Sequence, residues 1–283
     1  MRLFKKESKT DFDARSLPQT RKELFVDIVK NHFLDLFNIG LLLLVFSIPI
    51  FGAIIYKDAM YAAIREQFIS LLIDETTYKD SLMTVYYIYN AVMVFGFVVF
   101  SLGLAGSLRI IRNLCWLKPV FFMHDFLIGI KKNGLYYSII AFVCGLIHFA
   151  IQMSFLIQSE MIIKSIPLGV AIILIFPVLF ISFSMIQIYT NKLLSIIRLS
   201  FLIFVRSFLI HILFSICFIA VFFIYYIPFV VVVYVVLAVY ILAIFPFLLI
   251  SFHLYNLSRF DKYINKENEK EIYMLGLHQE KDE

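Results

Sequence analysis

The sequence predicts an all-α membrane protein with six transmembrane helices, and three observations support this class. Apolar residues make up 62% of the 283 positions and charged residues only 16%, whereas soluble domains are about 45–50% apolar. The apolar residues form continuous runs long enough to cross a hydrocarbon layer of about 30 Å as helices. The cations lie beside these runs, which is typical of the loops between transmembrane helices.

Six segments have the length and apolar composition of transmembrane helices. They are residues 33–55, 84–111, 135–157, 167–190, 208–226 and 229–252. The last two divide one apolar stretch, which is too long for a single span, and Tyr225-Tyr226-Ile227-Pro228 provides the turn between them. We therefore expect a membrane domain at residues 20–258. A mobile cytoplasmic tail at 1–19 precedes it and a charged cytoplasmic tail at 259–283 follows it.

The first span is followed by a polar insertion, residues 56–83. Pro49 and Gly52 lie in the outer half of that span and are expected to kink or end it. Within the insertion, Met60, Ile64 and Phe68 recur at helical spacing among several acids. The pattern favours an amphipathic helix on the outer membrane surface, with its acids in water.

The distribution of lysine and arginine sets the orientation. Of the 25 cations, the predicted outer segments carry only 4, and the other 21 lie on the opposite side. The outer cations are Lys57, Arg65, Lys79 and Lys164. Because cytoplasmic loops are enriched in Lys and Arg, this asymmetry places both termini in the cytoplasm and the chain in a cytoplasmic membrane.

A short pattern recurs before three of the spans. A phenylalanine stands five residues before a cation in the pairs Phe25/Lys30, Phe126/Lys131 and Phe201/Arg206, and a long apolar run follows each time. We interpret each as a cytoplasmic surface helix whose basic end anchors it at the membrane. The anchors are Lys30, Lys131, Lys132 and Arg206. The chain then consists of three parallel repeats, each a surface helix followed by a transmembrane hairpin. Thr20 and Glu23 have the spacing of a capping box at the start of the first surface helix.

The repeat also yields a candidate site. Five residues after each aligned cation stand Asp35, Tyr136 and His211. If the three units surround a common axis, these residues form a polar cluster near the cytoplasmic end, because a carboxylate in lipid requires a partner. In the alternative, Asp35 reaches interfacial water and the other two side chains point elsewhere.

No catalytic pattern accompanies these features. The sequence contains no HExxH, GxSxG, Walker or GxGxxG motif, and its three cysteines and six histidines lack metal-ligand spacing. We therefore expect no enzyme activity, no cofactor and no metal site. The net charge of +5 does not indicate nucleic-acid binding, since the cations adjoin membrane segments; the lipid bilayer is the expected partner.

Several segments resemble the YesL-like family of bacterial membrane proteins, whose molecular function is unknown. The resemblance rests on Gly103–Leu108, on Asp125-Phe126 with Lys131-Lys132-Asn133, on Ser47-Ile48-Pro49 and on Phe260-Asp261-Lys262-Tyr263. The insertion 56–83 and Gly134 depart from the family pattern. Because such proteins are often associated with carbohydrate uptake systems, the resemblance implies a bacterial plasma-membrane protein and a permease complex as partner.

Two classes of function follow. The first is a non-catalytic accessory or regulatory partner of a carbohydrate permease. The alternative is a small-solute transporter or channel, which would need a polar path across the membrane midplane. The middles of the third, fifth and sixth spans are nearly free of polar residues, and this favours the accessory protein.

Overall fold

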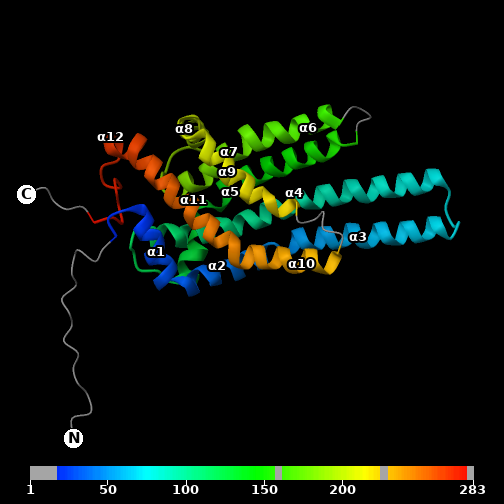
Figure 1. Ribbon diagram of the computed structural model, residues 1–283, viewed down its shortest axis with the longest axis horizontal. Helices are drawn as coiled ribbons and strands as arrows, with labels where there is room; N and C mark the ends of the chain where they lie inside the picture. The colour runs from blue at the N-terminus through cyan, green and yellow to red at the C-terminus, as the bar shows by residue number, and fades with distance from the viewer. Residues whose placement is uncertain (1–17, 157–160, 224–228, 279–283) are drawn as a thin grey trace, which may run out of the picture.

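The computed structural model describes residues 18–156, 161–223 and 229–278, and in these ranges the regular structure is entirely helical (Figure 1). The helices are α1 (Arg21–Asn31), α2 (Phe33–Phe46), α3 (Ile48–Ile69), α4 (Glu75–Cys115), α5 (Phe122–Ser154), α6 (Met161–Val170), α7 (Phe176–Ile186), α8 (Leu193–Arg206), α9 (Phe208–Phe223), α10 (Val230–Val239), α11 (Phe245–Phe260) and α12 (Lys266–Asn268). Three π-helical turns, η2 (Ala171–Ile175), η4 (Tyr240–Ile244) and η5 (Asp261–Asn265), join α6 to α7, α10 to α11 and α11 to α12.

Among the described residues, four helical segments are long and apolar enough to cross a membrane, and there are up to six if each of two bent helix pairs forms one span. The all-α class and its suitability for a bilayer are thereby confirmed. Several predicted segments lie wholly or partly outside the described residues. They are most of the N-terminal tail, the last residue of the third span, the end of the fifth span with the turn Tyr225–Pro228, and residues 279–283 of the C-terminal tail.

Sharp bends separate two of the three predicted surface helices from the helices that follow. The chain turns by 81° between α1 and α2 and by 110° between α8 and α9. His32 and Ser207 stand at these bends with non-helical backbone angles. At the start of α1, Thr20 accepts a hydrogen bond from the Glu23 amide and the Glu23 carboxylate accepts one from the Gln19 amide, which lowers the pKa of Glu23. The predicted cap is therefore present.

The middle surface helix is not separate from its span. Helix α5 runs unbroken from Phe122 to Ser154, through the boundary that the sequence analysis places between residues 134 and 135. The helix packs closely on α4 on both sides of this boundary: a Cβ at Gly129 would lie 2.6 Å from the Ala105 carbonyl oxygen, and one at Gly145 would lie 3.0 Å from the Val94 Cα. Because α5 packs this closely along α4, leaving α4 at residue 134 would break the contact.

The predicted insertion also takes a different form. The first span breaks at Ser47, where α2 ends and α3 begins with Pro49 in its first turn. Helix α3 then continues to Ile69 and pairs with α4, and the two reach beyond α5, α6 and α10 (Figure 1). Residues 56–83 therefore form the tip of a long helical hairpin and not a separate surface helix. The stacked rings of Phe68 and Tyr78 join the two arms near the tip.

Two of the π-helical turns have the same cause. Each of η2 and η4 is followed by Phe-Pro, at Pro177 and Pro246. Proline cannot donate the helical hydrogen bond to the residue four positions earlier and crowds its carbonyl, so the preceding turn widens. At η4 the carbonyl of Leu242 lies against Gly40 of α2, where an added Cβ would be 2.1 Å from the oxygen.

The C-terminal segment is folded onto the bundle. The sequence predicts a charged tail at residues 259–283, but α11 extends to Phe260 and residues 261–278 turn back toward α1 and the end of α4. The His278 amide donates to the Pro18 carbonyl at 2.9 Å. The two described chain ends thus meet at one end of the bundle, which we call the terminus end; the α3–α4 turn lies at the other (Figure 1).

Candidate functional site

A buried glutamine organises the polar interior of the terminus end. Gln187 follows α7 and is 2% exposed. Its amide nitrogen donates to the Ala105 carbonyl at 3.0 Å and to the Tyr137 hydroxyl at 2.9 Å, while its amide oxygen accepts from Asn133 at 2.9 Å. Tyr137 in turn donates to the Phe183 carbonyl at 2.6 Å. One side chain therefore links α4, α5 and α7.

Arg112 extends this network from the last turn of α4. One terminal nitrogen donates to the Gln187 carbonyl at 2.8 Å, and the other donates to the Asn113 amide oxygen at 2.9 Å. The guanidinium also lies over the Trp116 ring, 4.8 Å from its centroid. Its remaining nitrogen, Nε, is buried without a hydrogen-bond partner. The guanidinium is thus held in place without a carboxylate from the described residues.

A cavity of about 220 Å³ opens beside this network, between α4, α5 and the α7–α8 connection. Its lining contains two cations and several uncharged hydrogen-bonding groups, and no acid. The lining residues are Arg112, Lys132, Asn133, Tyr136, Ile186, Gln187, Ile188, Tyr189, Thr190 and Asn191. We call this cavity the terminus-end pocket.

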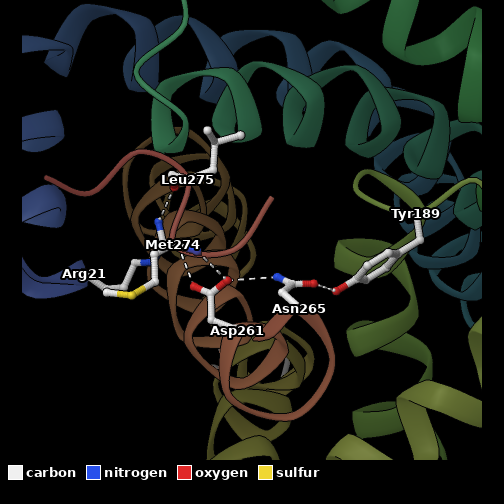
Figure 2. Close-up of polar contacts among 6 residues, drawn as sticks. All are labelled: Arg21, Tyr189, Asp261, Asn265, Met274 and Leu275. Carbon is white, nitrogen blue, oxygen red and sulfur yellow. Dashed lines mark hydrogen bonds and ion pairs between the residues drawn. The ribbon is translucent and has the colours of Figure 1, made fainter. Parts of the chain in front are cut away.

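One wall of the pocket is tied to the C-terminal segment (Figure 2). The Tyr189 hydroxyl donates to the Asn265 amide oxygen at 2.6 Å, and the Asn265 amide nitrogen donates to Asp261 at 2.9 Å. The second Asp261 oxygen accepts from Arg21 at 2.7 Å, and the Met274 amide donates to the first at 3.1 Å. Arg21 also donates to the Leu275 carbonyl.

We call this set, Arg21, Asp261, Asn265 and residues 274–275, the C-terminal clamp. The Arg21 and Asp261 side chains are 12% and 10% exposed, so the ion pair is largely shielded from water. Gly276 lets the segment close, because it has a φ of +86° and packs directly on the Cys115 carbonyl. The clamp therefore joins α1, the end of α4 and η5.

The predicted anchors lie at exposed positions. Lys30 is in the last turn of α1 and Arg206 in the last turn of α8, where Arg206 stacks on Tyr263. Lys131 and Lys132 are neighbours in the first third of α5, and both are exposed. Only Lys132 of this pair lines the pocket. Anchoring at a membrane stays a prediction for all four.

No hydrogen bond or ion pair of the described residues joins any two of Asp35, Tyr136 and His211. Asp35 is bonded to His32, three residues earlier, at 2.9 Å. His211 is fully buried and bonded to Asn256 of α11 at 2.9 Å and to Ser207. Tyr136 lines the terminus-end pocket. The three thus take part in separate contacts, because each helix turns its residue toward a different neighbour.

Gln187, Tyr137 and Arg112 are not among the site residues predicted from the sequence. Arg112 carried the best indication, since it is a cation directly after an apolar run of span length. Gln187 and Tyr137 lie inside apolar segments with no motif around them. Their role depends on four backbone or side-chain partners that come together only in the fold.

Comparison with known proteins adds no relative: no family model, curated protein or solved structure matches the chain. The arrangement itself therefore carries the functional argument. It consists of a polar pocket at the terminus end, a clamp that closes it on one side, and a long hairpin at the opposite end.

Proposed function

We propose that the chain is a non-catalytic integral protein of the bacterial cytoplasmic membrane that serves as an accessory or regulatory partner of a carbohydrate uptake system. The observation that supports an accessory role is the tip of the α3–α4 hairpin. It presents apolar side chains at a place that the bilayer does not cover.

The length of α4 supports this placement. Its 41 residues extend about 62 Å as an α-helix, about twice the hydrocarbon thickness of roughly 30 Å. With the predicted span at 84–111, residues 75–83 project about 14 Å farther at 1.5 Å per residue. The headgroup layer on one side is only about 5–8 Å thick. The turn between α3 and α4 thus stands in water.

That turn presents three exposed apolar side chains. Ile69, Leu71 and Leu72 are 68%, 89% and 75% exposed. Leu71 also has a φ of +57°, a left-handed conformation that costs a leucine about 1–2 kcal/mol. Strained, exposed residues of this kind occur where a segment contacts a partner. We propose that the turn docks on an apolar extracytoplasmic surface of a membrane permease.

Charge around the turn points to the same kind of partner. Exposed acids flank the apolar residues, at Glu66, Asp74, Glu75 and Asp80, whereas Arg65 and Lys79 are the nearby cations, and Lys79 is paired with Glu75. A surface with an apolar centre and basic rim on the permease complements this arrangement.

The proposal that the partner takes up carbohydrates rests only on the sequence resemblance to YesL-like proteins. The three-repeat architecture belongs to the same proposal. It is supported by the two bent pairs, α1–α2 and α8–α9, and by the two π-helical turns that precede Phe-Pro in the corresponding later spans. Cytoplasmic termini follow from the cation asymmetry.

The alternative of a solute transporter finds less support. Most of the large buried polar side chains among the described residues belong to the terminus end, including Asn133, Gln187, Asn256, Asp261 and Asn265. Farther along α4, the Asn90 side chain donates to the Tyr86 carbonyl of its own helix, as a packed rather than pore-lining amide would.

The test is purification of the tagged full-length chain from native membranes in a mild detergent. We expect an identified permease component to co-purify with the wild type and to be lost when Leu71 and Leu72 are both changed to serine. Leu194→Ser is the matched control, because Leu194 is 79% exposed at the terminus end, and it should retain the permease.

A photo-crosslinking residue at position 72 gives a direct measure of contact and should form an adduct with the same component. Capture of no transport protein by the wild type would refute the proposed function. Equal capture by the Leu71/Leu72 double variant would refute docking through the hairpin tip.

A further inference from the structure

The lining of the terminus-end pocket has the chemistry of an anion site. Arg112 and Lys132 bring two positive charges to it, and Tyr136, Thr190 and Asn191 add groups that can donate hydrogen bonds. None of the ten lining residues is an acid. Guanidinium and ammonium groups beside neutral donors are what phosphate oxygens require.

The Arg112 guanidinium has no negatively charged partner in the pocket. The guanidinium is partly buried, its Nε has no partner, and no acid of the described residues forms an ion pair with it. A buried cation without a counter-ion is unfavourable. A bound anion would supply that charge at the place where two hydrogen bonds already fix the guanidinium.

Three acids act electrostatically on the lining, Asp125 on Arg112 and both Asp261 and Glu269 on Tyr189, but none of them lines the pocket. Asp125, on the first turn of α5, is 3.8 Å from Arg109 and accepts a hydrogen bond from the Phe121 amide at 2.9 Å. It does not line the pocket. Helix α7 ends at this wall, and its carbonyl end disfavours anions, but the Gln187 carbonyl is already bonded to Arg112.

The surface of α5 next to the pocket distinguishes a lipid from a free anion. Lys132 is exposed at the pocket, and Leu135 and Ile139 follow three and seven residues later on the same face of the helix. These two are 72% and 42% exposed. In a bilayer, an apolar face of this kind contacts acyl chains, so a headgroup at Lys132 would have its chains along Leu135 and Ile139.

We propose that the terminus-end pocket binds the phosphate group of an anionic phospholipid. The Lys132 ammonium and the Arg112 guanidinium contact the phosphate oxygens, and the lipid chains lie along α5. This site differs from general attraction of basic residues to an anionic membrane, because it requires Lys132 and not the neighbouring Lys131.

Trp116 provides a reporter for the test. It is the single tryptophan of the chain and its ring packs against Arg112 at 4.8 Å. The full-length protein in a neutral detergent is titrated with phosphatidylglycerol, phosphatidylcholine or inorganic phosphate while Trp116 fluorescence is recorded. We expect a saturable change with phosphatidylglycerol and none with phosphatidylcholine.

The two adjacent lysines provide matched variants. Both are exposed, so neither substitution removes packing. Lys132→Ala should weaken the apparent affinity for phosphatidylglycerol at least about five-fold, the effect of one cation near an anionic headgroup, and Lys131→Ala should leave it within about two-fold of the wild type.

Three results would overturn the proposal. An equal response to phosphatidylcholine would show that the pocket does not distinguish an anionic lipid from a zwitterionic one. Equal weakening by Lys131→Ala and Lys132→Ala would show general surface attraction. A saturable response to inorganic phosphate with none to phosphatidylglycerol would reject the lipid and assign the pocket to a free anion.

Discussion

Tyr189 donates a hydrogen bond to Asn265 at 2.6 Å, across 76 positions of sequence. The phenol belongs to the α7–α8 connection and lines the terminus-end pocket, whereas the amide belongs to the C-terminal clamp. The pocket wall and the C-terminal segment are therefore directly connected by hydrogen bonds. A change that loosens the clamp should also displace a wall of the pocket.

The ion pair in the clamp should contribute strongly to stability. Asp261→Asn keeps the shape of the side chain but leaves the Arg21 guanidinium, whose side chain is 12% exposed, without its counter-ion. Breaking a buried pair in this way costs about 3–5 kcal/mol. We expect a lower thermal unfolding temperature of the purified protein in detergent.

Glu75→Gln is the control for that experiment. It removes the ion pair with Lys79, in which both side chains are more than two-thirds exposed, and such pairs contribute little because water screens them. The unfolding temperature should not change. A similar decrease in both variants would contradict the assigned role of the clamp.

Two adjacent tyrosines should differ in their effect on stability. Tyr137→Phe removes a hydroxyl that donates to Phe183 and accepts from Gln187, both in a buried site. Losing these bonds should destabilise the protein by about 1–3 kcal/mol. Tyr136 lines the pocket instead, and Tyr136→Phe should change stability little. Chemical denaturation of the two variants in the same detergent would compare them.

The close contact between α2 and η4 should not tolerate a methyl group. Gly40→Ala would place a Cβ 2.1 Å from the Leu242 carbonyl oxygen, which is backbone and cannot rotate away. Overpacking of this kind costs about 1–3 kcal/mol. Gly52→Ala meets nothing within 4 Å and should be neutral or slightly stabilising. Yields of folded protein by size-exclusion chromatography would separate the two.

The strain in the hairpin turn can be measured independently of docking. Leu71→Gly relieves a left-handed backbone at a side chain that is 89% exposed, so the unfolding temperature should stay the same or rise. Leu72→Gly, next to it, lacks this relief and should not raise stability. If Leu71→Gly lowered stability more than Leu72→Gly, the turn would not be strained.

Local features of the fold were predictable from the sequence. Thr20 and Glu23 form the expected cap, and Pro49 begins a new helix, because caps and prolines act within one helical turn. The bends at His32 and Ser207 follow the basic helix ends. The length of the hairpin was not predictable, since apolar residues at helical spacing suit a surface helix and a paired helix equally well.

Most of the polar site could not be predicted from the sequence. Arg21 and Asp261 are 240 positions apart, and Asp261 lies in a charged segment that resembles a tail. Gln187 is a single amide in an apolar run, and its partners come from α4 and α5. Short-range patterns carry no information on such contacts. The sequence therefore singled out Lys132, as a membrane anchor, but neither Arg112 nor the network that positions it.

The contact between Arg21 and Asp261 imposes an order of events on biosynthesis. Arg21 precedes Asp261 by 240 positions, so their ion pair cannot form until the apolar helices between them have been made. Until then, Arg21 has no counter-ion from η5, and Gly276 does not cover the Cys115 carbonyl at the end of α4. A chain that stops before residue 261 lacks the closing contact and leaves Arg21 without this counter-ion.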